Sequence, residues 1–326
     1  MSESKQLRWA VLGTGVIANQ MAQALQSMGR TLDAVGNRTY DKGVAFAEKY
    51  GVPKVYTDYN EMFTDPDIDI IYITTPHNTH MAFLEQALSH GKHVLCEKSI
   101  TLNSEELERA VSLARENGAV LAEAMTIYHM PLYRELRARV ASGALGGVNL
   151  IQLNFGSFKA YDMANRFFNP NLAGGAMLDI GVYALSLARL FLTSNPDQVR
   201  SFVRKAPTGV DESAVISMVN GESQLVNITL SLHSKQPKRA VISCERGYIE
   251  IMEYPRADEA VIVDAETGVR ETVHAGRTAD ALRYELEDME EAVRAKGDML
   301  LPYTADVMAL MTELRREWGV IYPEEL

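Results

Sequence analysis

Three side chains of this sequence could together move a proton to and from the oxygen of a small molecule. Lys98 follows a strand-like run, and Asp179 and Tyr183 lie in a glycine-bounded segment, Gly174–Tyr183, that leads into a predicted helix. Residues four apart on a helix share one face, so the acid and the phenol are expected to point the same way. A phenol with a pKa of ~10 needs a nearby cation to lose its proton near neutral pH.

These properties assign a candidate catalytic role to each side chain. Tyr183 is the first candidate proton donor or acceptor. Lys98 supplies the cation and polarises the substrate oxygen, or is itself the acid/base, while Asp179 orients a substrate hydroxyl or Lys98. The alternatives are a helix N-cap for Asp179 and a core aromatic for Tyr183.

A glycine turn near the start of the sequence is the first element that could position a cofactor. The run Gly13-Thr-Gly15-Val-Ile-Ala18 separates a predicted strand from a predicted helix and matches G-x-G-x-x-G/A. The first glycine permits a tight turn, the second lets backbone approach a pyrophosphate, and the alanine permits close packing of helix on strand. The helix N-terminus attracts the phosphates. An ordinary glycine turn is the alternative. The predicted cofactor-binding residues here are Gly13, Thr14, Gly15, Val16 and Ile17.

The end of the second predicted strand bears on which nicotinamide cofactor is used. NAD sites usually carry Asp or Glu there, roughly 20 residues past the glycines, to bind the ribose hydroxyls. This chain instead has Asn37-Arg38-Thr39. Arg38 can pair with a 2′-phosphate and stack on adenine, whereas a carboxylate would repel that phosphate. Asn37 and Arg38 therefore favour NADP(H), with NAD(H) still possible and a solvated surface arginine as the alternative for Arg38.

Polar residues follow two further predicted strands, at the edge where a parallel sheet binds its ligand. They lie in the segments Thr74–His80 and Gly91–Lys98. The first is expected to run along the cofactor and the end of the second to face the nicotinamide, although His80 could instead fix a turn. The cofactor-binding candidates in the two segments are Thr74, Thr75, Pro76, Asn78, His80, Glu97 and Lys98.

Alternation of strands and helices predicts a doubly wound parallel sheet, of the Rossmann type, in the first part of the chain. The predicted strands are 7–13, 31–36, 68–74, 93–97 and 119–123, and the predicted helices are 16–28, 40–50, 79–89 and 104–117. This rhythm ends near residue 124, so residues 1–124 are interpreted as a dinucleotide-binding domain.

Strand runs without intervening helices dominate the second part and predict an open, mostly antiparallel sheet in an α+β domain. The strand runs are 148–158, 198–204, 213–219, 225–234, 240–244, 248–252 and 260–264, with helices at 131–142, 179–193, 278–296 and 304–319. Residues 125–326 are interpreted as the substrate-binding and oligomerisation domain. The segment 283–294 is interpreted as a charged amphipathic helix with a solvated face. An uncovered apolar sheet face would need a partner, so a homodimer through this domain is expected.

Composition excludes several classes of protein. The 326 residues are 47% hydrophobic and 23% charged with a formal net charge of −11, which argues against nucleic-acid and anionic-membrane binding. No run of ~18 apolar residues predicts a membrane span, and the first six residues lack the apolar core of a signal peptide. The two cysteines, Cys96 and Cys244, are interpreted as reduced, buried thiols of a cytoplasmic protein. The histidine pairs lack further ligands, so no metal site is predicted.

The four motifs taken together resemble those of the Gfo/Idh/MocA oxidoreductases. The motifs G-x-G-x-x-A, T-P-H-N-x-H, G-K-H-V-x-x-E-K and G-G-x-x-L-D-x-G-x-Y occur in order between Leu12 and Tyr183. The resemblance implies that Lys98 is the catalytic lysine and that Asp179 and Tyr183 are the catalytic pair of the second domain. Tyrosine rather than histidine at the last position is similar to the dimeric dihydrodiol dehydrogenase and glucose–fructose oxidoreductase branches.

One position and one segment depart from the family pattern. Ser99 replaces the proline of E-K-P, which bears on how the lysine is placed. The segment Glu123-Ala-Met-Thr-Ile-Tyr128-His129 replaces E-A-M-W-x-R, so the family's substrate specificity does not transfer to this chain. His129 could reach the substrate or lie on a loop surface. The candidate substrate-binding residues are Lys98, Tyr128, Arg166, Asp179 and Tyr183.

Three functional interpretations follow. The first is an NADP(H)-dependent oxidoreductase that transfers hydride between nicotinamide and a carbinol or carbonyl carbon of a sugar, polyol or cyclic diol. The second is a glycoside hydrolase that uses tightly held NAD for transient oxidation. The third is a non-catalytic NADP-binding sensor of the same fold, against which the intact Lys98, Asp179 and Tyr183 argue.

Overall fold

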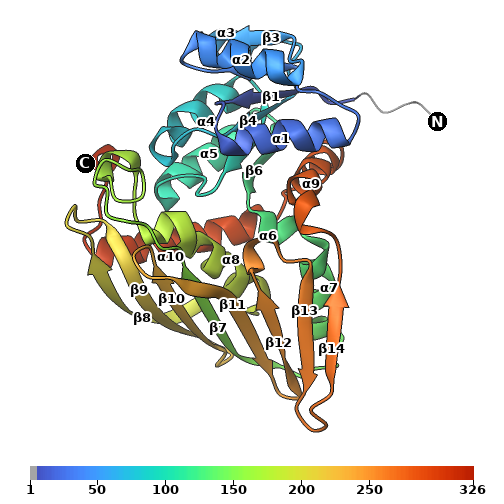
Figure 1. Ribbon diagram of the computed structural model, residues 1–326, viewed down its shortest axis with the longest axis vertical. Coiled ribbons are helices and arrows are strands. Elements are labelled where there is room, and N and C mark those ends of the chain that lie inside the picture. Colours follow the sequence, from blue (N-terminus) through green and yellow to red (C-terminus); the bar gives the residue numbers. More distant parts are fainter. Residues whose placement is uncertain (1–5) are drawn as a thin grey trace. The chain divides into compact units, whose positions relative to one another are not determined.

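The computed structural model describes residues 6–326 and divides them into two compact units (Figure 1). The first unit extends to Ala124 and includes Leu282–Leu301; the second comprises Met125–Ala281 and Pro302–Leu326. The division by sequence differs in one segment, because it assigned Leu282–Leu301 to the second domain. The expectation about a signal peptide concerns residues that lie almost wholly outside the described part of the chain.

The first unit contains a six-stranded parallel sheet in the order β3-β2-β1-β4-β5-β6, which confirms the predicted doubly wound fold. The chain winds outward from β1 in one direction and from β4 in the other, so the strand order reverses between these two neighbours, where such folds bind their ligand. The strands are β1 (Trp9–Leu12), β2 (Ala34–Gly36), β3 (Lys54–Tyr56), β4 (Ile70–Ile73), β5 (His93–Glu97) and β6 (Leu121–Ala124). The helices that connect them are α1 (Val16–Ser27), α2 (Tyr40–Tyr50), α3 (Tyr59–Thr64), α4 (His80–Ser89) and α5 (Ser104–Glu116).

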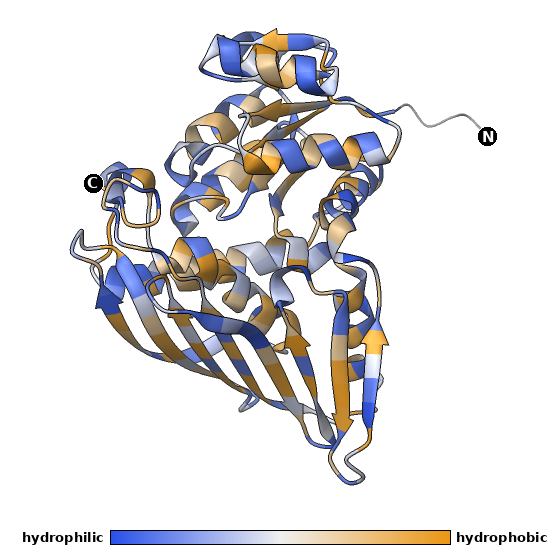
Figure 2. Ribbon diagram, viewed as in Figure 1, coloured by the Kyte–Doolittle hydropathy of each residue, from blue (hydrophilic) through white to orange (hydrophobic). Residues whose placement is uncertain are grey.

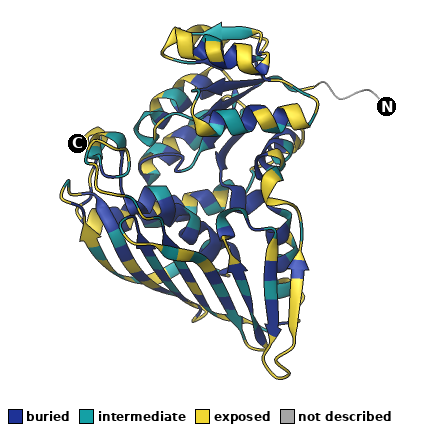
Figure 3. Ribbon diagram, viewed as in Figure 1, coloured by how far each residue is buried: buried dark blue, intermediate teal, exposed yellow. Residues whose placement is uncertain are grey.

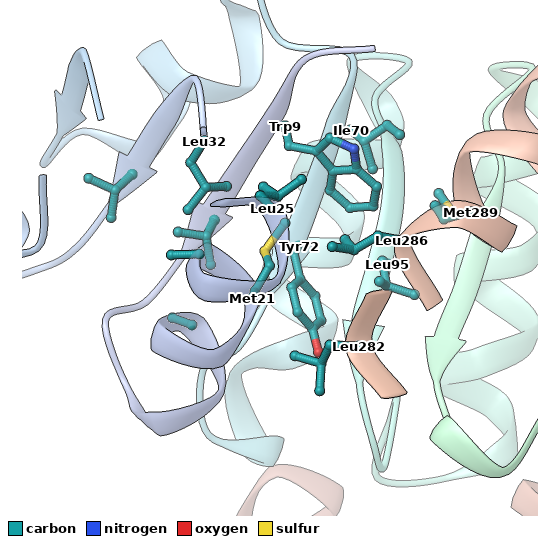
Figure 4. Packing of buried hydrophobic residues seen from close by; sticks show 14 of the residues in the cluster. Trp9, Met21, Leu25, Leu32, Ile70, Tyr72, Leu95, Leu282, Leu286 and Met289 are labelled. Atoms are coloured by element: carbon teal, nitrogen blue, oxygen red, sulfur yellow. The ribbon is translucent and has the colours of Figure 1, made fainter. Parts of the chain in front are cut away.

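Helix α9 (Ala281–Ala295) completes the core of the first unit, although it follows the second unit's sheet in sequence. Its apolar side chains, including Leu286 and Met289, pack with Trp9 and Tyr72 in one buried cluster (Figure 4). The Trp9 indole N–H donates to Glu290 Oε1 over 2.9 Å, which satisfies a polar atom of an otherwise apolar contact. The solvated face predicted for this segment is therefore only part of the helix, because its other face is buried.

The second unit contains an eight-stranded sheet in the order β14-β13-β12-β11-β7-β10-β9-β8. All neighbours are antiparallel except β7 and β10, which confirms the predicted mostly antiparallel sheet. The strands are β7 (Val148–Gly156), β8 (Pro196–Lys205), β9 (Asp211–Asn220), β10 (Leu225–Ser231), β11 (Gln236–Cys244), β12 (Gly247–Met252), β13 (Glu259–Asp264) and β14 (Arg270–His274). The helices are α6 (Thr126–His129), α7 (Pro131–Ala141), α8 (Val182–Phe191) and α10 (Leu301–Glu317).

Hydropathy alternates along the strands of this sheet, because one face packs on helices and the other does not (Figure 2). Burial follows the same period: in β9 the side chains of Ala214, Ile216 and Met218 are buried while Val215 and Ser217 between them are exposed (Figure 3). Helix α8 supplies much of the packing, with eight of its ten residues buried.

The segment Pro170–Phe191, which leads into and includes α8, has the length and apolar composition that could cross a membrane. Burial accounts for its composition: 83% of its most apolar window lies inside the protein, as in a core helix. Both cysteines are free, with Cys96 buried and Cys244 half-buried.

Candidate functional site

The glycine turn after β1 requires glycine at its first position. Gly13 has a φ of +106°, a conformation that side chains rarely allow, and its N–H donates to Gly36 O over 2.8 Å. A Cβ atom at Gly13 would lie 2.8 Å from Thr74 Oγ1. The turn therefore brings the end of β1 against the ends of β2 and β4.

The N-terminus of α1 is suited to hold the phosphates of a dinucleotide. Gly15 is the N-cap; no side chain caps the helix, and no acidic residue lies in its first turn. Nothing lies within 4 Å of where a Cβ of Gly15 would be, so this side of the turn has open space for a ligand. Ala18 is buried and permits close packing of the helix. Free N–H groups and the positive end of the helix dipole fit a pyrophosphate.

The segment after β2 borders the glycine turn. The Thr14 hydroxyl donates to Asn37 Oδ1 over 3.3 Å, and Asn37 Nδ2 donates to Thr39 O over 2.8 Å. Arg38 is exposed beside Tyr59, whose pKa is raised by burial against the opposing effect of the guanidinium. The guanidinium is thus available to an anion at this edge.

Two histidines contact the backbone at Lys98 and directly after it. His77 Nε2 lies 3.0 Å from Lys98 O. The buried His80 ring has Nε2 2.8 Å from Thr75 O and Nδ1 3.0 Å from Ser99 O, which ties the loop after β4 to the loop after β5. Burial lowers the pKa of His80, although its contacts with the backbone of Thr75 and Ser99 act in the opposite direction. These contacts match the turn-fixing alternative for His80.

Further contacts secure the end of β5. The Tyr72 hydroxyl donates to Glu97, and the Ile100 N–H donates to Glu123 Oε1 over 3.1 Å. Ser99, which replaces the family's proline, is buried and follows a cis peptide bond. Hydrogen bonds therefore hold the Glu97 side chain before Lys98 and the backbone at and after Lys98.

The second unit presents Asp179 and Tyr183 on one continuous helical segment. Asp179 lies in a π-type turn, Met177–Gly181, that runs directly into α8, where Tyr183 is the second residue. Such turns are frequent at functional sites. Because helical structure begins at Met177, Asp179 lies inside the segment and the N-cap alternative is wrong.

Arg166 and Phe155 adjoin this pair. The Asp179 carboxylate lies 3.5 Å from the Arg166 guanidinium, whose side chain is 58% exposed. The rings of Tyr183 and Phe155 lie 6.0 Å apart. The structure thus brings two of the predicted substrate residues, Arg166 and Asp179, into contact, and Tyr183 follows Asp179 by four positions on the same helical segment.

Tyr128 and His129 both lie in the short helix α6 and are buried. The Tyr128 ring lies 6.3 Å from that of Tyr303. His129 is 2% exposed, so the loop-surface alternative for this residue is wrong.

A buried carboxylate, which the sequence analysis missed, holds the start of the π-type turn. Asp211 Oδ2 accepts the Met177 N–H over 2.6 Å. Burial raises the pKa of Asp211 to about 6, although the Met177 amide and the charge of Arg315 act in the opposite direction. The only signal in the sequence is an acidic residue at the start of an otherwise apolar, alternating strand.

Replacement of Asp211 by Asn is expected to change how stability depends on pH. The folded-state pKa lies above that of an unfolded aspartate, so protonation favours the folded protein. The stabilisation of the folded protein by the protonated Asp211 carboxyl is fully present below about pH 4 and is lost as the pH rises through about 6. D211N should therefore gain stability relative to wild type across this window, by on the order of 3 kcal/mol at most. Urea unfolding of both proteins measures the difference, and parallel stability–pH curves would contradict it.

Two further observations on the described residues concern metal binding and an open depression. No group of three or more His, Cys, Asp or Glu side chains within residues 6–326 could hold a metal ion. An open depression of about 740 Å³ is lined by residues that include Arg8, Arg30 and Asp33. It lies at the amino-terminal ends of β1 and β2, opposite the edge that carries the glycine turn.

Two family models match this chain in sequence. One, described as an oxidoreductase family with an NAD-binding Rossmann fold, matches residues 7–125, and the Gfo/Idh/MocA C-terminal domain matches residues 133–250. Among curated relatives, the trans-1,2-dihydrobenzene-1,2-diol dehydrogenase of Xenopus tropicalis is 28% identical over 330 residues, covering 97% of this chain and 99% of the relative.

Solved structures share the fold over nearly the whole chain. A levoglucosan dehydrogenase in complex with NADH and levoglucosan superposes with a TM-score of 0.86 at 18% identity, covering 97% of each chain. A 3-ketoreductase from Actinomadura kijaniata in complex with NADP and TDP-benzene gives a TM-score of 0.84 at 21% identity, covering 96% of this chain and 98% of the other.

The family model of the Rossmann fold spans the glycine turn and the loops that hold Lys98. The family model of the C-terminal domain spans the segment with Asp179 and Tyr183. The candidate residues of each unit thus lie within a matched domain of one oxidoreductase family. The chain belongs to the Gfo/Idh/MocA family of NAD(P)-binding oxidoreductases.

Proposed function

We propose that this protein is an NADP(H)-dependent oxidoreductase that interconverts a secondary alcohol and a ketone, or a lactol and a lactone, on a sugar, polyol or cyclic diol. The observation that carries the proposal is the intact proton-transfer set, Lys98, Asp179 and Tyr183, in a chain of this family. The similarity to a diol dehydrogenase over 97% of the chain supports the substrate class.

The bound nicotinamide supplies the hydride acceptor or donor. In the oxidative direction the carbinol carbon gives up its hydrogen with both bonding electrons, and the hydroxyl proton passes to Tyr183 Oη. Lys98 supplies the positive charge that favours the phenolate and polarises the substrate oxygen. Asp179 orients a substrate hydroxyl, with Arg166 beside it. In the reductive direction the same groups return the proton.

The cofactor preference rests on the segment after β2. Arg38 is exposed there, and no carboxylate occupies positions 37–39, where an NAD site usually has one. A guanidinium pairs with a phosphate monoester through charge-assisted hydrogen bonds. NADP(H) is therefore the preferred cofactor in this proposal. A cytoplasmic location is also part of the proposal, because the two cysteines are free thiols.

The test is turnover of a panel of sugars, polyols and trans-dihydrodiols with NADP⁺ and with NAD⁺. Net formation of reduced cofactor with a panel member is the expected result. Release of sugar from a glycoside without net reduction would support the hydrolase instead, and cofactor binding without any turnover would support the sensor. Either outcome would overturn the proposal.

The uncovered face of the eight-stranded sheet is the proposed dimer interface. Phe202 on β8 is 81% exposed and pairs in register with Val215 on β9, which is 43% exposed. Leu225 and Met252 on β10 and β12 are also about half exposed. Exposed apolar residues spread over several strands favour burial against a second copy. Sedimentation should show a dimer at micromolar concentration that Phe202→Glu converts to monomer; a monomeric wild type would contradict the interface.

A further inference from the structure

The segment Val320–Glu325, which follows α10, binds the backbone just before the π-type turn. The Tyr322 ring is fully buried, and its hydroxyl donates to Gly174 O over 2.8 Å. These two residues are 148 positions apart in sequence. Gly174 is the first glycine of the motif that carries Asp179 and Tyr183, so the contact joins this distant segment to the candidate catalytic residues.

A buried ion pair holds Tyr322 in place. The Arg315 side chain is 1% exposed and donates to both carboxylate oxygens of Glu325, over 2.8 and 2.9 Å. Its guanidinium also lies over the Tyr322 ring, 4.6 Å from the centroid, and the Tyr322 N–H donates to Glu325 Oε2. A bidentate pair of this kind fixes geometry as well as charge. We call Arg315, Tyr322 and Glu325 the tyrosine clamp.

Asp211 holds the same backbone segment through a second contact. Gly175 has a φ of +131°, and a Cβ there would lie 2.2 Å from Asp211 Oδ1 and 3.4 Å from Tyr322 Oη. Glycine is therefore required where the chain passes close to both the carboxylate and the phenol. Asp211 also accepts the Met177 N–H, as described above. The backbone of residues 174–177 is thus hydrogen-bonded at both of its ends, to Tyr322 at Gly174 and to Asp211 at Met177.

We propose that the tyrosine clamp positions Asp179 for proton transfer, an inference that rests on the proposed function. The clamped backbone ends at Met177, and Asp179 is only two residues further along the same turn. A small displacement of Gly174 therefore moves the carboxylate relative to its substrate. Misplacement of a catalytic group by about 1 Å can lower the rate by about 10²-fold.

Tyr322→Phe tests this with little change in packing, because it removes only the hydroxyl. Tyr133→Phe is the matched control: Tyr133 is also a buried phenol of the same unit and donates to a backbone carbonyl, that of Tyr254. We expect Y322F to lower kcat by about 10- to 100-fold without a change in the Kd for NADP⁺. Y133F should lose comparable thermal stability but little activity.

A double-mutant cycle separates positioning from general destabilisation. If the clamp acts through Asp179, then adding Y322F to Asp179→Asn should lower kcat by less than about twofold. Glu325→Gln, which keeps the shape of the clamp but weakens its ion pair, should show the same dependence on Asp179. Full, multiplicative losses in the D179N background would overturn the inference.

Hydrogen exchange of the peptide that covers residues 174–183 provides a readout that needs no substrate. Exchange should be faster in Y322F than in wild type and unchanged in Y133F. Unchanged exchange in Y322F would overturn the inference. Absence of turnover by the wild-type protein would instead overturn the proposed function, so the two failures are distinguishable.

Discussion

Lys98→Met and Tyr183→Phe are each expected to lower kcat by about 10²- to 10⁴-fold, the range that a positioned acid or base contributes. Lys98→Met removes the cation but keeps the aliphatic chain, and Tyr183→Phe keeps the ring that lies beside Phe155. Both variants should still bind NADP⁺, because the glycine turn that holds the pyrophosphate is unchanged, although the Kd of Lys98→Met can rise since Lys98 is also a cofactor-binding candidate. Stopped-flow or steady-state kinetics, with cofactor binding followed by fluorescence, measures both quantities.

The losses of kcat caused by the two substitutions should not multiply, because removing either group already removes most of what the pair does together. The double variant is therefore expected to resemble the more impaired single variant. Tyr248→Phe on β12, a half-exposed phenol elsewhere in the second unit, is the matched control and should retain wild-type kcat. Near-wild-type turnover by both single variants would show that the catalytic assignment is wrong.

Arg38→Asp is expected to reverse the preference between the two cofactors. It replaces a group that can pair with the 2′-phosphate by one that repels it and can bind ribose hydroxyls. Loss of a charge-assisted interaction worth about 1.5–3 kcal/mol predicts a rise in KM for NADP⁺ of about 10- to 100-fold. The KM for NAD⁺ should fall or stay the same.

Arg115→Asp is the control for this change, because it alters the charge of the same unit by the same amount on the exposed side of α5. Its kinetics with both cofactors should match those of wild type. If R38D binds NADP⁺ as tightly as wild type does, Arg38 is a surface residue and the basis for the cofactor preference is removed.

Local sequence signals were sufficient to predict five of the six strands of the first unit's sheet. The residue types and spacing of Gly13, Gly15 and Ala18 are enough to indicate the turn. The apolar run Ile70–Ile73 indicates a strand covered on both faces. Strand β3 and helix α3 were missed because Lys54–Tyr56 and Tyr59–Thr64 are too short to show a period.

Contacts between residues distant in sequence account for most of the other differences. Helix α9 has an ordinary amphipathic pattern, and nothing local shows that it packs with Trp9 and Tyr72 of the first unit. His80 matched a motif, but only the fold shows both ring nitrogens at backbone carbonyls. Nothing in the sequence around Tyr322 indicated its hydrogen bond, because its partner Gly174 lies far away in the chain.

Transfer of deuterium tests the central claim most directly. A panel substrate that carries deuterium at the oxidised carbinol carbon is incubated with NADP⁺ and wild-type protein, and the reduced cofactor is analysed by mass spectrometry. The account predicts one deuterium in each reduced nicotinamide formed, and a large loss of its formation rate in K98M and Y183F. Reduced nicotinamide without deuterium, or no reduction with any panel member, would contradict it.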